Sequence, residues 1–265
     1  MIISLCIKDG TNIARVKDAG FDAFEFNGAV LCGMEEDAFR CLLQEKEQSG
    51  LPCVGINAYS SGIPALVGPF YDRAECIRYA EKICTRASAL GAAGIGIGAP
   101  KARILPEGFS RTEADMQFSQ MLTDLAEVAG CRGIRVLIEA LHQGFCNYIN
   151  TTDEAAALQQ SLEFNNLRLV FDFYHSAQQG EDAVEMFCRY SNRIAHVHFS
   201  SAHGVTDRGY PRRSDRETYL AYLRALFEAG YTGAVSVEPD IFDAVEAAEC
   251  ASMLKECVVE AEQEG

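Results

Sequence analysis

Residues 135–141 read RVLIEAL, a short apolar run that carries one carboxylate, Glu139, near its end. Runs of similar length and composition recur along the chain at residues 2–7, 21–27, 53–59, 94–99, 167–173, 195–201 and 233–239. Each has the length of a strand that is buried in a parallel sheet. The segments between them show helical periodicity, as in residues 74–90, whose apolar side chains recur on one face. The sequence therefore predicts strand and helix alternating eight times.

This alternation over 265 residues predicts the α/β class and a single (β/α)8 TIM barrel, forming one domain over residues 1–265. A doubly wound parallel sheet is the alternative, because the order of strands cannot be read from sequence. The sequence does not match the phosphate-binding fingerprint that is typical of such a sheet. The glycines of residues 94–98 lie inside an expected strand and meet Ala99 and Pro100 where a helix should begin. We interpret them as small residues in a crowded barrel.

Helix starts are expected at Ser110, with Glu113 completing a capping box, and at Thr152. The last helix, residues 244–264, has one apolar face, which we expect to cover the barrel. Its members are Val245, Ala248, Met253, Leu254 and Val258.

Composition limits the partners that the protein can have. Lys and Arg number 23 and Asp and Glu 38, which gives a formal charge of -15. Such a surface repels phosphate backbones, and the longest basic cluster is the pair Arg212 and Arg213. We expect a small-molecule ligand, no nucleic acid and no membrane. The eleven cysteines contain no CxxC pair, and the N-terminus lacks the features of a secretion signal, so we expect reduced thiols and a cytoplasmic location.

Chemistry is expected where the strands end, because a TIM barrel builds its active site from the carboxyl ends of its strands. The last four strands end in Glu139, Asp172, His198 and Glu238. Three carboxylates and one imidazole suit a hard divalent ion, so we expect Mn²⁺, with Mg²⁺ or Co²⁺ as alternatives.

Five motifs resemble the xylose isomerase-like TIM barrel superfamily, in particular its sugar isomerase and epimerase group, which includes ketose 3-epimerases and hydroxypyruvate isomerases. They are GFDAFEF at residues 20–26, IEAL at 138–141, DFYH at 172–175, HVHF at 196–199 and VEP at 237–239. The resemblance extends over nearly the whole chain. It implies a mononuclear metal site made of the same four residues, with Glu139 and Glu238 as the catalytic acid and base.

The resemblance also implies roles around that metal. His175 would hold a substrate oxygen, and His198 rather than His196 would bind the metal. His196 would then point to the other side of its strand as a packed or hydrogen-bonded residue. Glu25 would support the site through a hydrogen bond.

Departures from the pattern concern the substrate. Phe145 and Cys146 stand where ketose 3-epimerases carry a further Glu, so one substrate contact is missing. Arg208 is expected to be the counterpart of the family's substrate-binding Arg, displaced by a loop insertion that also contains His203. The alternative is that Arg208 is a solvated Arg of this loop.

Three further residues are expected to contact substrate. His142 follows Glu139 by three residues and stands where the family often has Asn. Arg103 follows the fourth strand, and its alternative is a surface Arg paired with Glu107. Asn57 ends the third strand, where the DNA-repair branch of the superfamily has a metal-binding His.

The function expected is a divalent-metal-dependent sugar isomerase or epimerase. Removal of a proton next to a carbonyl would give a cis-enediolate, stabilised by the metal and His175. The alternative is a lyase of the inosose dehydratase or C-glycoside-cleaving type, which would use the same enolising site. An apurinic endonuclease and a silent sugar-binding subunit are less favoured. A homo-oligomer is compatible with the sequence.

Overall fold

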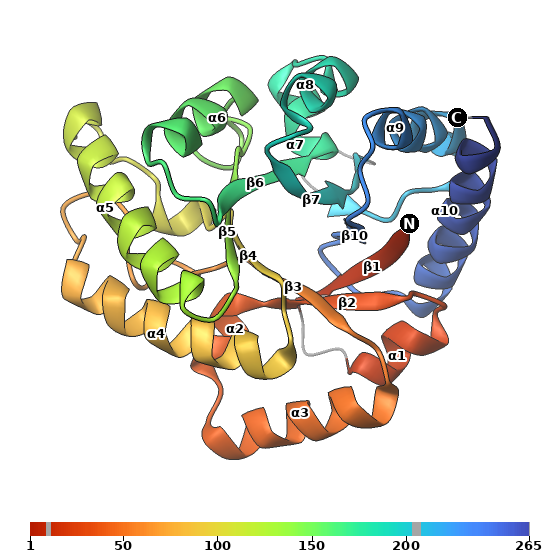
Figure 1. Cartoon of the computed structure of the whole chain (residues 1–265), viewed down its shortest axis with the longest axis horizontal. Helices are drawn as coiled ribbons and strands as arrows, with labels where there is room; N and C mark the ends of the chain where they lie inside the picture. The colour runs from red at the N-terminus through yellow and green to blue at the C-terminus, as the bar shows by residue number, and fades with distance from the viewer. Residues whose placement is uncertain (9–11, 203–207, 265) are drawn as a thin grey trace.

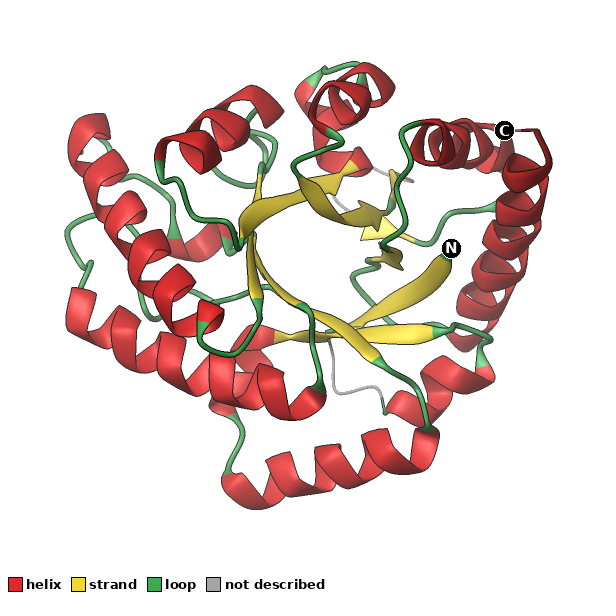
Figure 2. Cartoon of the chain, viewed as in Figure 1, coloured by secondary structure: helices red, strands yellow, loops and turns green. Residues whose placement is uncertain are grey.

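A closed barrel of eight parallel strands forms the centre of the protein (Figures 1 and 2). The computed structural model describes residues 1–8, 12–202 and 208–264. The barrel strands are β1 (Ile2–Ile7), β2 (Ala23–Asn27), β3 (Cys53–Asn57), β4 (Gly94–Ile97), β5 (Arg135–Glu139), β6 (Leu167–Asp172), β7 (Ile194–Phe199) and β10 (Ala234–Val237). Their order around the barrel is β1, β10, β7, β6, β5, β4, β3 and β2. The predicted (β/α)8 barrel is confirmed, and the doubly wound alternative is excluded because β1 pairs with both β2 and β10.

Helices surround the barrel (Figure 2). They are α1 (Ile13–Asp18), α2 (Gly28–Gly33), α3 (Glu36–Ser49), α4 (Arg73–Leu90), α5 (Arg111–Gly130), α6 (Thr152–Ser161), α7 (Phe173–Gln179), α8 (Ala183–Tyr190), α9 (Arg216–Glu228) and α10 (Ala244–Glu264). Short 3-10 turns, η1 (Pro100–Ala102) and η2 (Arg213–Asp215), and a small antiparallel pair, β8 (Ser201–Ala202) with β9 (Arg208–Gly209), complete the described structure. No helix among the described residues is long and apolar enough to cross a membrane.

Two of the predicted helix starts agree with the structure to within one residue. The Ser110 side chain accepts a hydrogen bond from the Glu113 N–H and begins α5 as expected. For α6 the cap is Thr151 rather than Thr152. The Thr151 hydroxyl accepts from the Glu154 N–H, and the Glu154 carboxylate accepts from the Thr151 N–H, which completes a capping box.

The buried face of α10 differs from the predicted one at its start. Met253, Leu254 and Val258 are buried as expected, but Val245 is 68% exposed and Ala248 is also exposed. Ala247 and Cys250 take their places against the barrel. The helix therefore begins its packing two residues later, with a face rotated from the predicted one.

Candidate metal centre and active site

Four side chains at the carboxyl end of the barrel converge on one point. Glu139 and Asp172 are the last residues of β5 and β6, His198 lies one residue before the end of β7, and Glu238 follows β10 directly. Each is at most 5% exposed. One ligand atom from each lies within 4.8 Å of the ligand atoms of the other three. The structure thus brings together the four residues that the sequence indicated.

Three buried atoms of this cluster lack a hydrogen-bond partner within the described part of the chain: Glu139 Oε1, Asp172 Oδ2 and His198 Nδ1. The His198 Nδ1 atom lies 3.4 Å from both Glu139 Oε1 and Glu238 Oε2. Leaving buried polar atoms unpaired is costly, and in native proteins it calls for an explanation. Oxygen donors with one imidazole are the set that Mn²⁺ or Mg²⁺ accepts, so these residues fit a divalent metal.

Asp172 is oriented by the helix that follows it. Its Oδ1 atom accepts hydrogen bonds from the backbone N–H groups of Tyr174, at 2.8 Å, and His175, at 3.2 Å, and so caps α7. The cap leaves Oδ2 free to face the cluster. Burial, followed by the neighbouring Glu139, raises the pKa of Asp172 to about 7.

Two cations offset the negative charge of the cluster. Arg208 binds Glu238 with both terminal nitrogens, at 2.7 and 3.0 Å, and its Nη1 lies 3.6 Å from Asp172 Oδ2. Lys8 Nζ lies 3.0 Å from Glu238 Oε1. Burial alone would raise the pKa of Glu238, but Arg208, Lys8 and His198 hold it well below its usual range. Glu238 is therefore held as a carboxylate.

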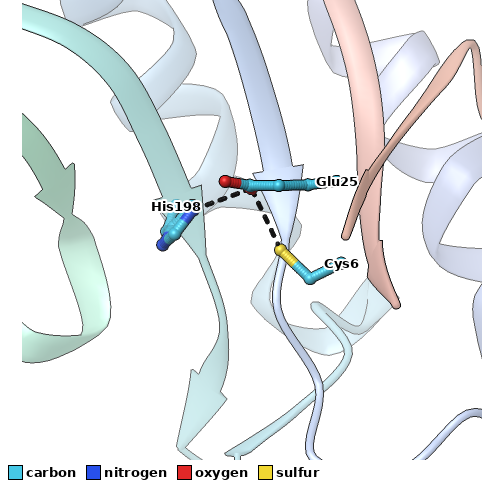
Figure 3. Close-up of side chains that lie close together, drawn as sticks. All are labelled: Cys6, Glu25 and His198. Atoms are coloured by element: carbon cyan, nitrogen blue, oxygen red, sulfur yellow. Dashed lines mark hydrogen bonds and ion pairs between the residues drawn. The ribbon is translucent and has the colours of Figure 1, made fainter. Parts of the chain in front are cut away.

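His198 is fixed by a carboxylate on the side away from the cluster, because its Nε2 faces Glu25 while its Nδ1 faces Glu139 and Glu238. Figure 3 shows the Glu25 carboxylate next to the His198 ring. The Glu25 Oε2 atom lies 3.0 Å from His198 Nε2 and accepts a hydrogen bond from the Cys6 thiol at 3.2 Å. A carboxylate on one imidazole nitrogen fixes the ring so that the other nitrogen faces the metal. Burial lowers the pKa of His198, but Glu25 and the two glutamates of the cluster raise it to well above its usual value.

The expectation that His196 points away from His198 is wrong. His196 Nε2 lies 3.1 Å from the same Glu25 oxygen and 2.9 Å from the Ser236 hydroxyl. Residues two apart on a strand share a face, so both rings reach Glu25. The part of the prediction that made His196 a packed and hydrogen-bonded residue is confirmed.

A cavity of ≈ 370 Å³ opens over the cluster. Its lining includes Glu139, Glu238, His175 and Arg208, together with Lys8, Asn27, Ala58, Ser60, Ser61, Gly98, Ala99, Pro100, Lys101, Leu141, Phe145 and Asp240. Burial and Arg208 lower the pKa of His175 well below its usual value, which keeps the ring neutral. A neutral imidazole at the wall can hydrogen-bond an oxygen of a bound ligand.

His142 and Arg103 lie behind residues of the cavity wall. His142 Nδ1 is 2.7 Å from His175 Nδ1, so one ring donates to the other. Arg103 is fully buried, and its Nη2 donates to the backbone oxygen of Glu139 at 2.8 Å. The alternative reading of Arg103 as a surface residue is wrong, because η1 turns its side chain inward under Phe118. Neither residue lines the ≈ 370 Å³ cavity, and their expected contact with substrate stays a prediction.

Asn57 is buried, and its Nδ2 lies 3.5 Å from Glu238 Oε1. His203 lies outside the described residues. Two features of the site escaped sequence reasoning. Lys8 follows the first strand directly, a position that could have identified it. Gly98 has no side chain, and the Glu139 carboxylate fills the space that a Cβ would occupy.

Fold and site together define a (β/α)8 barrel with a buried acidic cluster at the carboxyl ends of its strands, suited to one divalent metal. The pattern of the xylose isomerase-like TIM barrel matches residues 13–257, and the chain belongs to this family.

Sugar epimerases are among its relatives. The chain is 24% identical over 196 residues to the 3-dehydro-D-guloside 4-epimerase of Escherichia coli (strain K12), covering 71% of this chain and 72% of that protein. It is 24% identical over 231 residues to the ketose 3-epimerase of Arthrobacter globiformis, covering 86% and 76% of the two chains. The structure of L-ribulose 3-epimerase has the same fold, with a TM-score of 0.79 at 17% identity over 99% of this chain and 96% of that chain.

Proposed function

We propose that this protein is a divalent-metal-dependent epimerase or isomerase that acts on a sugar or a sugar derivative. The observation that carries the proposal is the convergence of three unpaired buried ligand atoms with Glu238 at the floor of a ≈ 370 Å³ cavity. A cavity of this size is at the lower end of those that bind small molecules. The named activities of the epimerase relatives support the same class.

Glu139, Asp172, His198 and Glu238 would hold the metal, with Mn²⁺ as the expected ion. When bound, the metal would polarise a substrate carbonyl and acidify the adjacent C–H bond.

Proton transfer falls to two carboxylates that line the cavity. Glu139 lies at the end of β5 and Glu238 at the end of β10, and strands β6 and β7 lie between these two in the barrel. The two carboxylates would therefore reach the substrate from separate positions in the cavity. Arg208 and Lys8 keep Glu238 ionised, which suits it to accept the first proton. Glu139, after taking up a proton from solvent, would then deliver it to the same carbon, which inverts that carbon, or to the neighbouring carbon, which isomerises the sugar. Neutral His175 would bind the oxygen on which negative charge develops.

The test is solvent deuterium incorporation, followed by proton NMR in D₂O with Mn²⁺-loaded protein. The panel contains ketoses, aldoses, inososes, keto-glycosides and their phosphates. We expect exchange at one carbon that a chelator abolishes and Mn²⁺ restores. Glu238→Gln should abolish the exchange. The control Glu246→Gln, which removes an exposed carboxylate that pairs with Arg212, should not.

Absence of exchange across the panel while Mn²⁺ is bound would contradict the proposal, as would exchange that survives the chelator. Exchange accompanied by a dehydrated or unsaturated product would instead establish the lyase.

A further inference from the structure

Cys6, Glu25 and His198 form a second group of possible ligands on the far side of His198 from the four-residue cluster. Their ligand atoms lie within 4.8 Å of one another, and all three residues are buried. Figure 3 shows the Glu25 carboxylate between the Cys6 thiol and the His198 ring. We propose that these three residues are a binding site for a thiophilic divalent cation, of the class of Zn²⁺ or Cd²⁺.

The distances suit such an ion. Cys6 Sγ and His198 Nε2 lie 3.2 and 3.0 Å from Glu25 Oε2. In a tetrahedral site with metal–ligand bonds of about 2.0–2.3 Å, neighbouring ligand atoms are separated by about 3.3–3.5 Å. To admit the ion, the sulfur and the nitrogen therefore need to move only a few tenths of an ångström from the Glu25 oxygen.

The donor set separates this site from the cluster above it. Thiolate and imidazole select soft or borderline ions, whereas the three carboxylates of the cluster suit hard ones. His196 holds Glu25 from the remaining side, with its Nε2 3.1 Å from Glu25 Oε2 and 2.9 Å from the Ser236 hydroxyl. The carboxylate thus stays in place when the thiol hydrogen bond is exchanged for a metal bond.

Binding exchanges two protons for the cation, with no change in oxidation state. The Cys6 S–H bond and the His198 Nε2–H bond both break, the sulfur and Nε2 bind the ion, and the two protons leave to solvent. The His198 ring keeps its remaining proton on Nδ1, the atom that faces the cluster. A cation bound to Cys6, Glu25 and His198 therefore opposes the binding of a metal by His198 in the four-residue cluster.

The test follows Cd²⁺ binding to the metal-free full chain through the ultraviolet thiolate-to-cadmium charge-transfer band. To remove background thiols, all proteins carry serine at the three exposed cysteines, Cys41, Cys131 and Cys188. We expect the band intensity of a single cadmium-bound thiolate per chain. Cys6→Ser should abolish the band. The control Cys53→Ser, at a buried cysteine on β3, the strand that pairs with the Glu25 strand β2, should keep it.

Asp172→Asn separates the two sites. It should keep the Cd²⁺ band while lowering Mn²⁺ affinity at least tenfold, as measured from the free Mn²⁺ signal in electron paramagnetic resonance. Cys6→Ser should abolish the Cd²⁺ band and leave the Mn²⁺ affinity unchanged. If Cys6→Ser does not fold, as judged by circular dichroism, Cys6→Ala is used, and the single-thiolate intensity of the parent protein remains diagnostic.

No band in the parent protein, a band that survives loss of Cys6, or a band that depends on Asp172 would each overturn the proposal. None of these readouts uses turnover, so they stand apart from the deuterium-exchange test.

Discussion

Gly98 provides a sharp test of the position of Glu139. An ideal Cβ at Gly98 would overlap Glu139 Oε2, far inside the 3.0 Å that real Cβ atoms respect, and would lie 3.5 Å from Glu139 Cδ. Gly98→Ala must therefore displace the carboxylate by about 1 Å, a misplacement that costs about 10²-fold in rate, or about 2.7 kcal/mol. Gly98 does not have a positive φ, so alanine fits the backbone there.

The assay combines deuterium exchange, Mn²⁺ affinity and urea denaturation. We expect Gly98→Ala to lower kcat/KM about 100-fold with unfolding free energy within about 1 kcal/mol of the parent protein. Gly96→Ala is the control, because a Cβ there would meet the Ile56 oxygen and Val170 Cγ2 at an ordinary 3.5 Å. Equal activity of the two variants would refute the claim that Glu139 acts from its observed position.

Three further predictions concern other parts of the structure. Arg208→Gln should raise the pKa of Glu238, because it removes a cation that lowers this pKa, so the acidic limb of the exchange rate should move to higher pH. Arg212→Gln should leave that limb unchanged. Glu181→Ala should lower the free energy of unfolding, measured in urea, by about 1–3 kcal/mol. The reason is that Glu181 accepts hydrogen bonds from the Thr152 N–H, the Thr152 hydroxyl and the Ser176 hydroxyl. The control Glu185→Ala, which removes an exposed ion pair with Arg189, should lower it by less than about 0.5 kcal/mol. Of the eleven cysteines, only the three exposed ones should react quickly with a disulfide reagent. Cys188 should be the slowest of these three at neutral pH, because burial raises the pKa of its thiol. Fast reaction of a fourth thiol would contradict the burial pattern.

The fold could be predicted because strand and helix periodicities differ and recur eight times along the chain. That regularity also located the cluster, since a barrel brings the ends of strands β5, β6, β7 and β10 to one rim. A local pattern cannot show where a long side chain turns. The alternative of a surface Arg103 paired with Glu107 is wrong for this reason, because the side chain extends inward to the backbone oxygen of Glu139.

The error over His196 has a different origin, because strand alternation alone places it on the face of His198. Lys8 was missed because the search for ligands favoured acidic and imidazole side chains. Its position one residue after β1 makes it a counterpart of the acidic strand ends.

Arg208 and Lys8 act as counterions that belong to the chain itself. Their contacts with Glu238 offset part of the negative charge of the rim, so we expect the barrel to fold without the ion. Small zinc-binding domains differ, because their metal affinity and their folding free energy are one quantity. Here an arriving metal must displace existing ion pairs, so part of its intrinsic affinity is lost to that exchange. Removal of the metal should then leave an assembled protein that can be reloaded without refolding.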